Sequence, residues 1–282
     1  MIRSAALILW LACAATAHAQ PVQRVATLAP FLAELVFAAG AGGKLVGVSA
    51  FSDYPREARS LPVIADAGGV NREALLALRI DAVLAWKSGT PGKQIEALRQ
   101  SGLNVIVVDG DRLDDIPRLL RRIGEIVGPA DPAEQAAARF ERELGAVRAQ
   151  YGSKTEVSAM LEIWHRPLMT ISGKHYMSDA LLACGGRNVF ADYPGVAPEV
   201  SIESVLKANP VAIIGAGSAQ DERRFRESWL RFPALYAVKQ GHLIYLEPDL
   251  IQRQTPRILD GIHRLCVALE GVRSSRQTSR AR

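Results

Sequence analysis

The chain has 282 residues, of which 49% are hydrophobic, and a formal net charge of +5. This length and apolar content predict a packed core in one large domain or two of moderate size, and they argue against disorder. Arg3 and the four arginines after Val272 account for the whole charge excess, so the body between them is net neutral. Nucleic acid is therefore not expected as a partner.

The first segment, residues 1–19, is typical of a cleaved signal peptide. Arg3 precedes an apolar run from residue 5 to 15, and the small residues Ala17 and Ala19 mark a cleavage site after Ala19. The run is too short to span a bilayer as a mature helix, so we expect export to the periplasm. The residues before Cys13 fit a lipidation signal poorly.

Cleavage would leave two cysteines, Cys184 and Cys266. In an oxidising compartment an even pair favours a disulfide, which would close a loop of about 80 residues. Two buried free thiols are the alternative.

The first half of the mature chain alternates strand and helix patterns. This alternation with short turns predicts a helix-covered, parallel α/β lobe over residues 20–129. The expected strands are 24–28, 44–48, 82–86 and 105–108, and the expected helices are 32–39, 93–101 and 113–127.

A long helical pattern then runs without interruption from residue 130 to 150. Its apolar stripe is narrow, with Ala136, Phe140, Leu144 and Val147 at helical spacing. Such a helix suits a brace that links two bodies.

The α/β pattern restarts after this helix and predicts a second lobe over residues 151–272. Its expected strands are 157–164 and 242–246, with a further strand inside 201–216, and its expected helices are 178–184, 221–230 and 256–269. The arginine-rich end, residues 273–282, is expected to be a disordered basic tail. The fold class is therefore α/β, with two lobes joined by a single long helix.

One helix–strand unit occurs in each lobe, at residues 71–86 and 201–216. Each copy opens on a polar capping residue, Asn71 or Ser201, and carries a glutamate two places later, Glu73 or Glu203. A first-turn carboxylate is favoured by the helix dipole, and this alone could explain both glutamates.

The sequence shows little sign of catalytic chemistry. The four histidines of the mature chain, His165, His175, His242 and His263, form no close ligand pair, so no metal site is expected. A Gly-x-Ser-x-Gly elbow is missing. An exported α/β hydrolase, the alternative from another class, would need a nucleophile–base pair that the sequence does not display.

Aromatic and polar residues instead gather in the loops that follow predicted strands. Tyr54 follows strand 44–48, Trp86 ends strand 82–86, and Trp164 and His165 end strand 157–164. Ligands of open α/β sheets bind outside the carboxyl ends of the strands. These loops therefore predict a cleft between two lobes that binds a sizeable flat organic ligand.

Residues 24–40 (RVATLAPFLAELVFAAG), 46–55 (VGVSAFSDYP), 71–86 and 184–190 (CGGRNVF) resemble the periplasmic cobalamin-binding proteins of ABC importers. These proteins belong to a wider helix-linked group that binds siderophores, haem and corrinoids. The resemblance implies two Rossmann-like lobes, a rigid linking helix, a Cys184–Cys266 bridge and a corrinoid carried as cargo, with no cofactor of the protein's own. We expect a monomer that acts with a membrane permease and has no enzymatic activity.

The resemblance also implies roles for particular residues. Glu73 and Glu203 match the two positions that engage the permease. The positions that match the ligand cleft are Pro30, Tyr54 and Trp86 in the first lobe, and Met169, Ala197, Asp249 and Arg253 in the second.

This chain departs from the resemblance at two cleft tryptophans, which are replaced by residues near Ala67 and Ala197. The altered cleft leaves open another corrinoid such as cobinamide, or a ferric siderophore or haem. Tyr54, Tyr193 and His165 could supply an axial ligand to haem.

Overall fold

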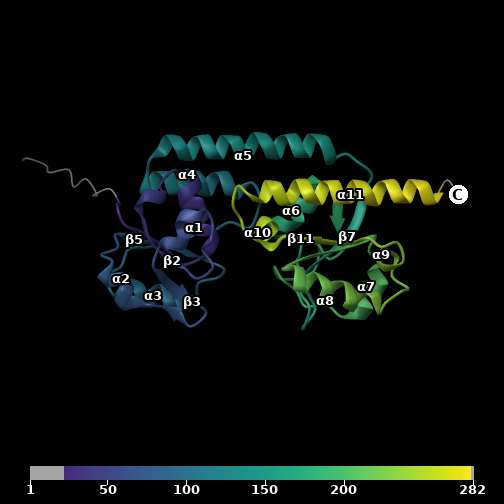
Figure 1. Ribbon diagram of the computed structural model, residues 1–282, viewed down its shortest axis with the longest axis horizontal. Helices are drawn as coiled ribbons and strands as arrows, with labels where there is room; N and C mark the ends of the chain where they lie inside the picture. The colour runs from purple at the N-terminus through teal and green to yellow at the C-terminus, as the bar shows by residue number, and fades with distance from the viewer. Residues whose placement is uncertain (1–21, 281–282) are drawn as a thin grey trace, which may run out of the picture.

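The computed structural model describes residues 22–280, with the side chains of residues 279 and 280 excepted. The predicted signal peptide and Cys13 lie outside this range. Two α/β lobes stand side by side, and one long helix, α5, runs across both of them (Figure 1). Within residues 22–280, no helix has both the length and the apolar character needed to cross a membrane.

The N-terminal lobe is built on a six-stranded sheet in the order β4-β3-β2-β1-β5-β6. All neighbouring strands are parallel except the short pair β3 and β4. The elements of this lobe are β1 (Val25–Thr27), α1 (Pro30–Ala38), η1 (Gly42–Lys44), β2 (Leu45–Ser49), η2 (Arg56–Ser60), β3 (Val63–Asp66), β4 (Gly69–Val70), α2 (Arg72–Ala77), β5 (Ala82–Trp86), α3 (Gly92–Gln100), β6 (Val105–Val108) and α4 (Asp115–Val127).

The C-terminal lobe has a five-stranded sheet in which β11, β10, β7 and β8 follow one another and β9 also pairs with β7. Its elements are β7 (Val157–Trp164), β8 (Met169–Thr170), α6 (Tyr176–Ala183), β9 (Gly186–Asn188), α7 (Ile202–Ala208), β10 (Ala212–Ala216), α8 (Ala219–Leu230), α9 (Tyr236–Lys239), β11 (Leu243–Leu246), α10 (Pro248–Ile251) and α11 (Ile258–Arg280). The predicted two-lobed α/β class is confirmed.

The linking helix α5 spans Ala130–Tyr151 and buries a single stripe along its length. Phe140, Leu144 and Val147 lie on this stripe as predicted, whereas Ala137 is fully buried and the predicted Ala136 is only half-buried. The stripe packs on α4, α11 and α6, so the helix contacts elements of both lobes.

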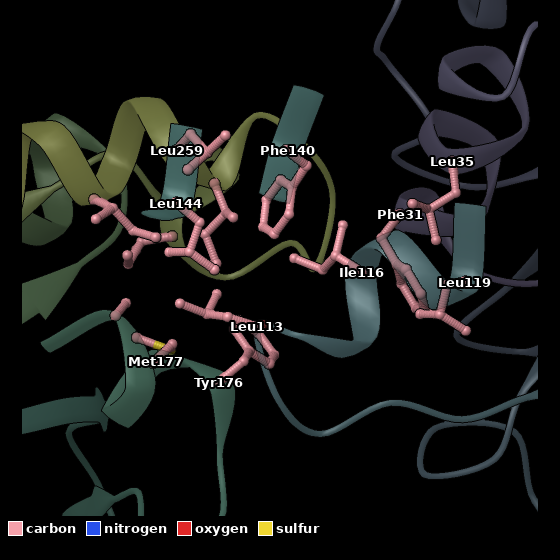
Figure 2. Packing of buried hydrophobic residues seen from close by; sticks show 14 of the residues in the cluster. Phe31, Leu35, Leu113, Ile116, Leu119, Phe140, Leu144, Tyr176, Met177 and Leu259 are labelled. Atoms are coloured by element: carbon pink, nitrogen blue, oxygen red, sulfur yellow. The ribbon is translucent and has the colours of Figure 1, made fainter. Parts of the chain in front are cut away.

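The largest hydrophobic cluster runs through the junction of the lobes, and each lobe has a smaller cluster of its own. Phe31 from α1, Ile116 from α4, Phe140 from α5 and Met177 from α6 belong to the same buried cluster, as Figure 2 shows. A continuous core across the junction restricts the lobes to small relative movements, because well-packed interiors do not deform continuously.

Cys184 at the end of α6 and Cys266 in α11 form a disulfide, with a Cα–Cα distance of 4.8 Å. Both residues are fully buried, and 82 positions separate them in the sequence. The predicted disulfide is confirmed, and the alternative of two free thiols is wrong.

The prediction of a disordered tail from residue 273 is wrong, because α11 continues to Arg280. Arg273 is buried, and its guanidinium donates hydrogen bonds to the carbonyls of Thr155 (2.7 Å), Cys184 (2.7 Å) and Gly185 (3.1 Å). These carbonyls lie beside the disulfide at the end of α6. The first arginine of the basic segment is therefore part of the C-terminal lobe.

Candidate functional site

The junction between the lobes is held by Arg253, which leaves the C-terminal lobe to contact the N-terminal one. Its Nη1 donates to Glu34 Oε1 at 2.8 Å and to Asp53 Oδ1 at 2.7 Å, and its Nη2 donates to the Phe51 carbonyl at 3.2 Å. Asp249, one helical turn earlier, pairs with the same guanidinium at 2.9 Å. The structure thus brings the two predicted ligand residues Asp249 and Arg253 together. The Arg253 guanidinium, however, already binds carboxylates of the protein itself.

Arg257 extends this network to the predicted ligand residue Tyr54. Its guanidinium lies 3.7 Å above the Tyr54 ring and binds Glu34 through two hydrogen bonds of 2.9 and 2.7 Å. Glu34 is the one charged residue of α1 and is almost fully buried. We call Glu34, Asp53, Tyr54, Asp249, Arg253 and Arg257 the junction network.

In the junction network, hydrogen bonds between opposite charges stabilise the charged forms of Arg253 and Asp53. Burial opposes the charge of Arg253, but the hydrogen bonds to Glu34 and Asp53 outweigh it and raise its pKa. Burial would raise the pKa of Asp53, whereas its hydrogen bond with Arg253 overcomes this and lowers the pKa. The charged forms of Arg253 and Asp53 therefore stabilise each other, and their ion pair connects the two lobes.

Pro30 and Trp86 lie together on the N-terminal lobe. Pro30 is the first residue of α1, and the neighbouring Phe31 ring meets the Trp86 ring edge-on, with centroids 5.5 Å apart. Trp86 is half-buried at the end of β5, and its Nε1 has no hydrogen-bond partner among the described residues. The two predicted residues thus share one patch at the carboxyl ends of β1 and β5.

Met169 and Ala197 lie together on the C-terminal lobe. Met169 in β8 pairs with Trp164 of β7. The amide N–H of the next residue, Thr170, donates a hydrogen bond to the Pro198 carbonyl at 3.0 Å. Ala197 is exposed in this neighbouring loop, and Met169 is half-buried. Both residues are therefore placed beside the β7–β8 turn.

A cavity of about 950 Å³ opens on the C-terminal lobe at the carboxyl ends of β7, β10 and β11. None of the seven predicted ligand residues lines it, but Gln252, the neighbour of Arg253 in the sequence, does. Its lining includes Glu162, Trp164, His165, Arg166, Arg231 and Tyr245. Of this lining, the sequence pattern predicted Trp164 and His165 as part of a ligand site, in the loop after β7.

A buried carboxylate organises one wall of the cavity. Glu162 Oε2 accepts a hydrogen bond from Trp229 Nε1 at 2.5 Å, and Glu162 Oε1 lies 3.1 Å from His165 Nδ1. Burial raises the pKa of Glu162, while Trp229 and His165 act in the opposite direction. In the described part of the chain, no three His, Cys, Asp or Glu side chains gather to hold a metal ion.

Glu73 and Glu203 are exposed on the second residue of α2 and α7, on the side of the molecule away from α5 (Figure 1). The Asn71 side chain accepts from the Ala74 amide, and the Ser201 hydroxyl accepts from the Ser204 amide. Hydrogen bonds from its own backbone amide and from Ser201 lower the pKa of Glu203. The two capped helices therefore present one carboxylate on each lobe.

Comparison with known proteins identifies the family. Residues 25–250 match the family model described as Periplasmic binding protein. The chain is 34% identical over 257 residues to a Vitamin B12-binding protein of Vibrio parahaemolyticus, covering 91% of this chain and 93% of the relative. A Vitamin B12-binding protein of Yersinia pestis is also 34% identical, with 91% and 90% covered.

Solved structures agree with this similarity. The periplasmic vitamin B12 binding protein BtuF of Vibrio cholerae superposes with a TM-score of 0.81 at 32% identity, covering 90% of this chain and 98% of that one. A periplasmic heme binding protein of Pseudomonas aeruginosa reaches a TM-score of 0.77 at 25% identity, with 88% and 92% covered. The chain therefore belongs to the periplasmic binding protein family.

Proposed function

We propose that the protein is the periplasmic receptor of an ABC importer and captures cobalamin or a related corrinoid between its two lobes. The observation that carries the proposal is the 34% identity, over 91% of the chain, to proteins named for vitamin B12 binding. The receptor acts as a monomer, has no enzymatic activity and carries the corrinoid as cargo.

The geometry supports a large, flat and mostly uncharged ligand. A cavity of about 950 Å³ lies at the carboxyl ends of three strands, where α/β sheets bind ligands. Trp164 and Tyr54 offer exposed aromatic surface in the two lobes. Among the described residues, Arg166 and Arg231 of the cavity have no ion-pair partner, so their guanidinium groups are available to the amide carbonyls at the periphery of a corrinoid.

Titration of the mature protein, residues 20–282, with cyanocobalamin, cobinamide, haem and a ferric siderophore tests this function. We expect one-to-one calorimetric binding of a corrinoid with a submicromolar Kd, because a cavity of this size combines aromatic surface with several polar groups that can fix the ligand's orientation. Binding of haem or siderophore alone would replace the ligand but keep the receptor function. Failure of all four ligands to bind would contradict the proposed site.

We also propose that Glu73 and Glu203 dock the receptor on the permease. Their matched positions on helix N-termini support a contact with two cations of the permease, one for each lobe. The Glu73→Ala/Glu203→Ala protein should reduce corrinoid uptake by cells at least about tenfold and leave the corrinoid Kd unchanged.

The matched control is Glu143→Ala, which removes an exposed carboxylate from α5 on the opposite side of the molecule. This control should leave uptake and affinity as they are. Unaltered uptake by the double variant would exclude these glutamates as docking residues.

A further inference from the structure

We infer that His165 is a built-in axial ligand, whose Nε2 coordinates the cobalt of a bound corrinoid that carries an exchangeable water. The inference rests on the proposed function and adds a metal–protein bond to it. The receptor would then distinguish corrinoids by whether the axial ligand of their cobalt can be exchanged, as well as by their ring.

His165 stands on the cavity wall directly after β7. Its Nδ1 lies 3.1 Å from Glu162 Oε1, and its side chain is 43% exposed, so the ring is anchored on one side and open on the other. In an imidazole the two nitrogens point in nearly opposite directions. Nε2, which has no partner among the described residues, therefore points away from the buried Glu162.

Glu162 is itself held in place. Trp229 is fully buried and donates from Nε1 to Glu162 Oε2, so the carboxylate keeps Oε1 turned toward His165. The hydrogen bonds from Trp229 and His165 both favour the ionised form of Glu162 against the effect of burial. In that form the carboxylate only accepts hydrogen bonds, which selects the tautomer with the proton on Nδ1 and a free lone pair on Nε2. A carboxylate behind a histidine is the arrangement that orients metal-binding histidines and increases their basicity.

The other described histidines do not share this arrangement. His242 uses both nitrogens, with Nδ1 near the Val211 carbonyl at 3.0 Å and Nε2 near Ser275 Oγ at 2.8 Å. His175 places Nδ1 at the N-cap of α6 and is stacked on Tyr176, and His263 lies exposed on α11. His165 is the histidine of the described chain that lines the cavity.

His165 lines the cavity from the C-terminal lobe, at the carboxyl end of β7. A flat ring held between two lobes turns its two faces toward the two walls, and the axial positions of its metal point at those walls. Imidazole nitrogen is a suitable ligand for such a transition metal. In the coordination step the Co–O bond to water breaks, a Co–N bond to Nε2 forms and the water leaves, with no transfer of an electron or a proton.

Aquocobalamin and cyanocobalamin provide the test, because cyanide blocks the axial position that water leaves free. Binding to the wild-type protein should move the visible absorption bands of aquocobalamin to those of an imidazole complex, and should leave the bands of cyanocobalamin in place. His165→Ala should abolish this shift and weaken aquocobalamin binding at least about tenfold more than cyanocobalamin binding. Free imidazole added to the variant complex should restore the shift.

His263→Ala is the control and should retain both the shift and the affinity. Glu162→Gln, which keeps the size of the side chain but removes its charge, should weaken the shift without removing it. Tight binding of aquocobalamin by the wild-type protein with no spectral shift would overturn the axial bond and leave the receptor function intact. If neither cobalamin binds, the receptor function fails, and this inference fails with it.

Discussion

Replacing Glu34 with alanine should lower the free energy of unfolding by about 3 kcal/mol, measured by urea denaturation of the mature protein. Glu34 is the shared partner of Arg253 and Arg257, and its side chain is 2% exposed. Removing one partner from a buried ion pair leaves a desolvated charge behind, which costs about 3–5 kcal/mol. We expect the lower end, because Arg253 keeps Asp53 and Asp249 as partners.

The matched control for Glu34→Ala is Glu156→Ala. Glu156 pairs with Arg187 at 2.7 Å, but both side chains are more than half exposed, and exposed ion pairs contribute about 0–1 kcal/mol. The control should therefore shift the urea midpoint very little. If Glu34→Ala is as stable as this control, the junction network does not hold the lobes together. Adding Arg257→Ala to Glu34→Ala should recover part of the loss, since it removes the unpaired cation.

Breaking the Cys184–Cys266 bond should lower the free energy of unfolding by about 4 kcal/mol, because the bond closes a long loop in the unfolded chain. The measurement compares urea denaturation of the oxidised protein with that of the Cys184→Ala/Cys266→Ala protein. Alanine is the replacement of choice because both cysteines are fully buried.

A reducing agent gives an independent measurement of the same contribution. The oxidised wild-type protein should lose stability on complete reduction, as verified by thiol counting, whereas the double alanine variant should not respond. Equal midpoints for the oxidised and reduced wild-type protein would show that the loop closure contributes nothing to stability.

The strands with a clear apolar run could be predicted from the sequence, and β3, β4, β8 and β9 could not. The runs at β5 and β6 consist of consecutive apolar residues, and β7 is apolar except for Ser158 and Glu162; the predicted bounds of all three match the structure. In contrast, β9 has three residues, two of them polar, and β3 ends in an aspartate. These two strands depend on pairing with β7 and β2, which no local pattern encodes.

The basic end of the chain was predicted to be disordered because its arginines dominate the local composition, although the helical spacing of apolar residues leads up to it. Leu265, Leu269 and Val272 continue the buried face of α11 at helical spacing, and the buried Arg273 follows directly after them. Arg273 finds its carbonyl partners 88 or more residues away, so its burial could not be predicted from neighbouring residues.

The candidate site shows the same limit. The bonds from Glu34 to Arg253 and Arg257 join residues more than 200 positions apart. The sequence held one clue to them, since Glu34 is a single charge inside an otherwise apolar helix. Glu162 and His165 are three residues apart at the end of β7. Only the fold shows that Trp229 donates a hydrogen bond to the Glu162 carboxylate and so holds it next to His165.

The hydrophobic cluster that continues across the lobe junction beneath α5 has a consequence for ligand import through the permease. A receptor whose lobes barely move presents nearly the same face to its permease whether it is loaded or empty, provided that Glu73 and Glu203 form that face. Under the proposed docking, empty copies would compete with loaded ones for the permease. An excess of receptor over ligand would then slow import, so the import rate would depend on the ratio of receptor to ligand and not on the amount of receptor alone.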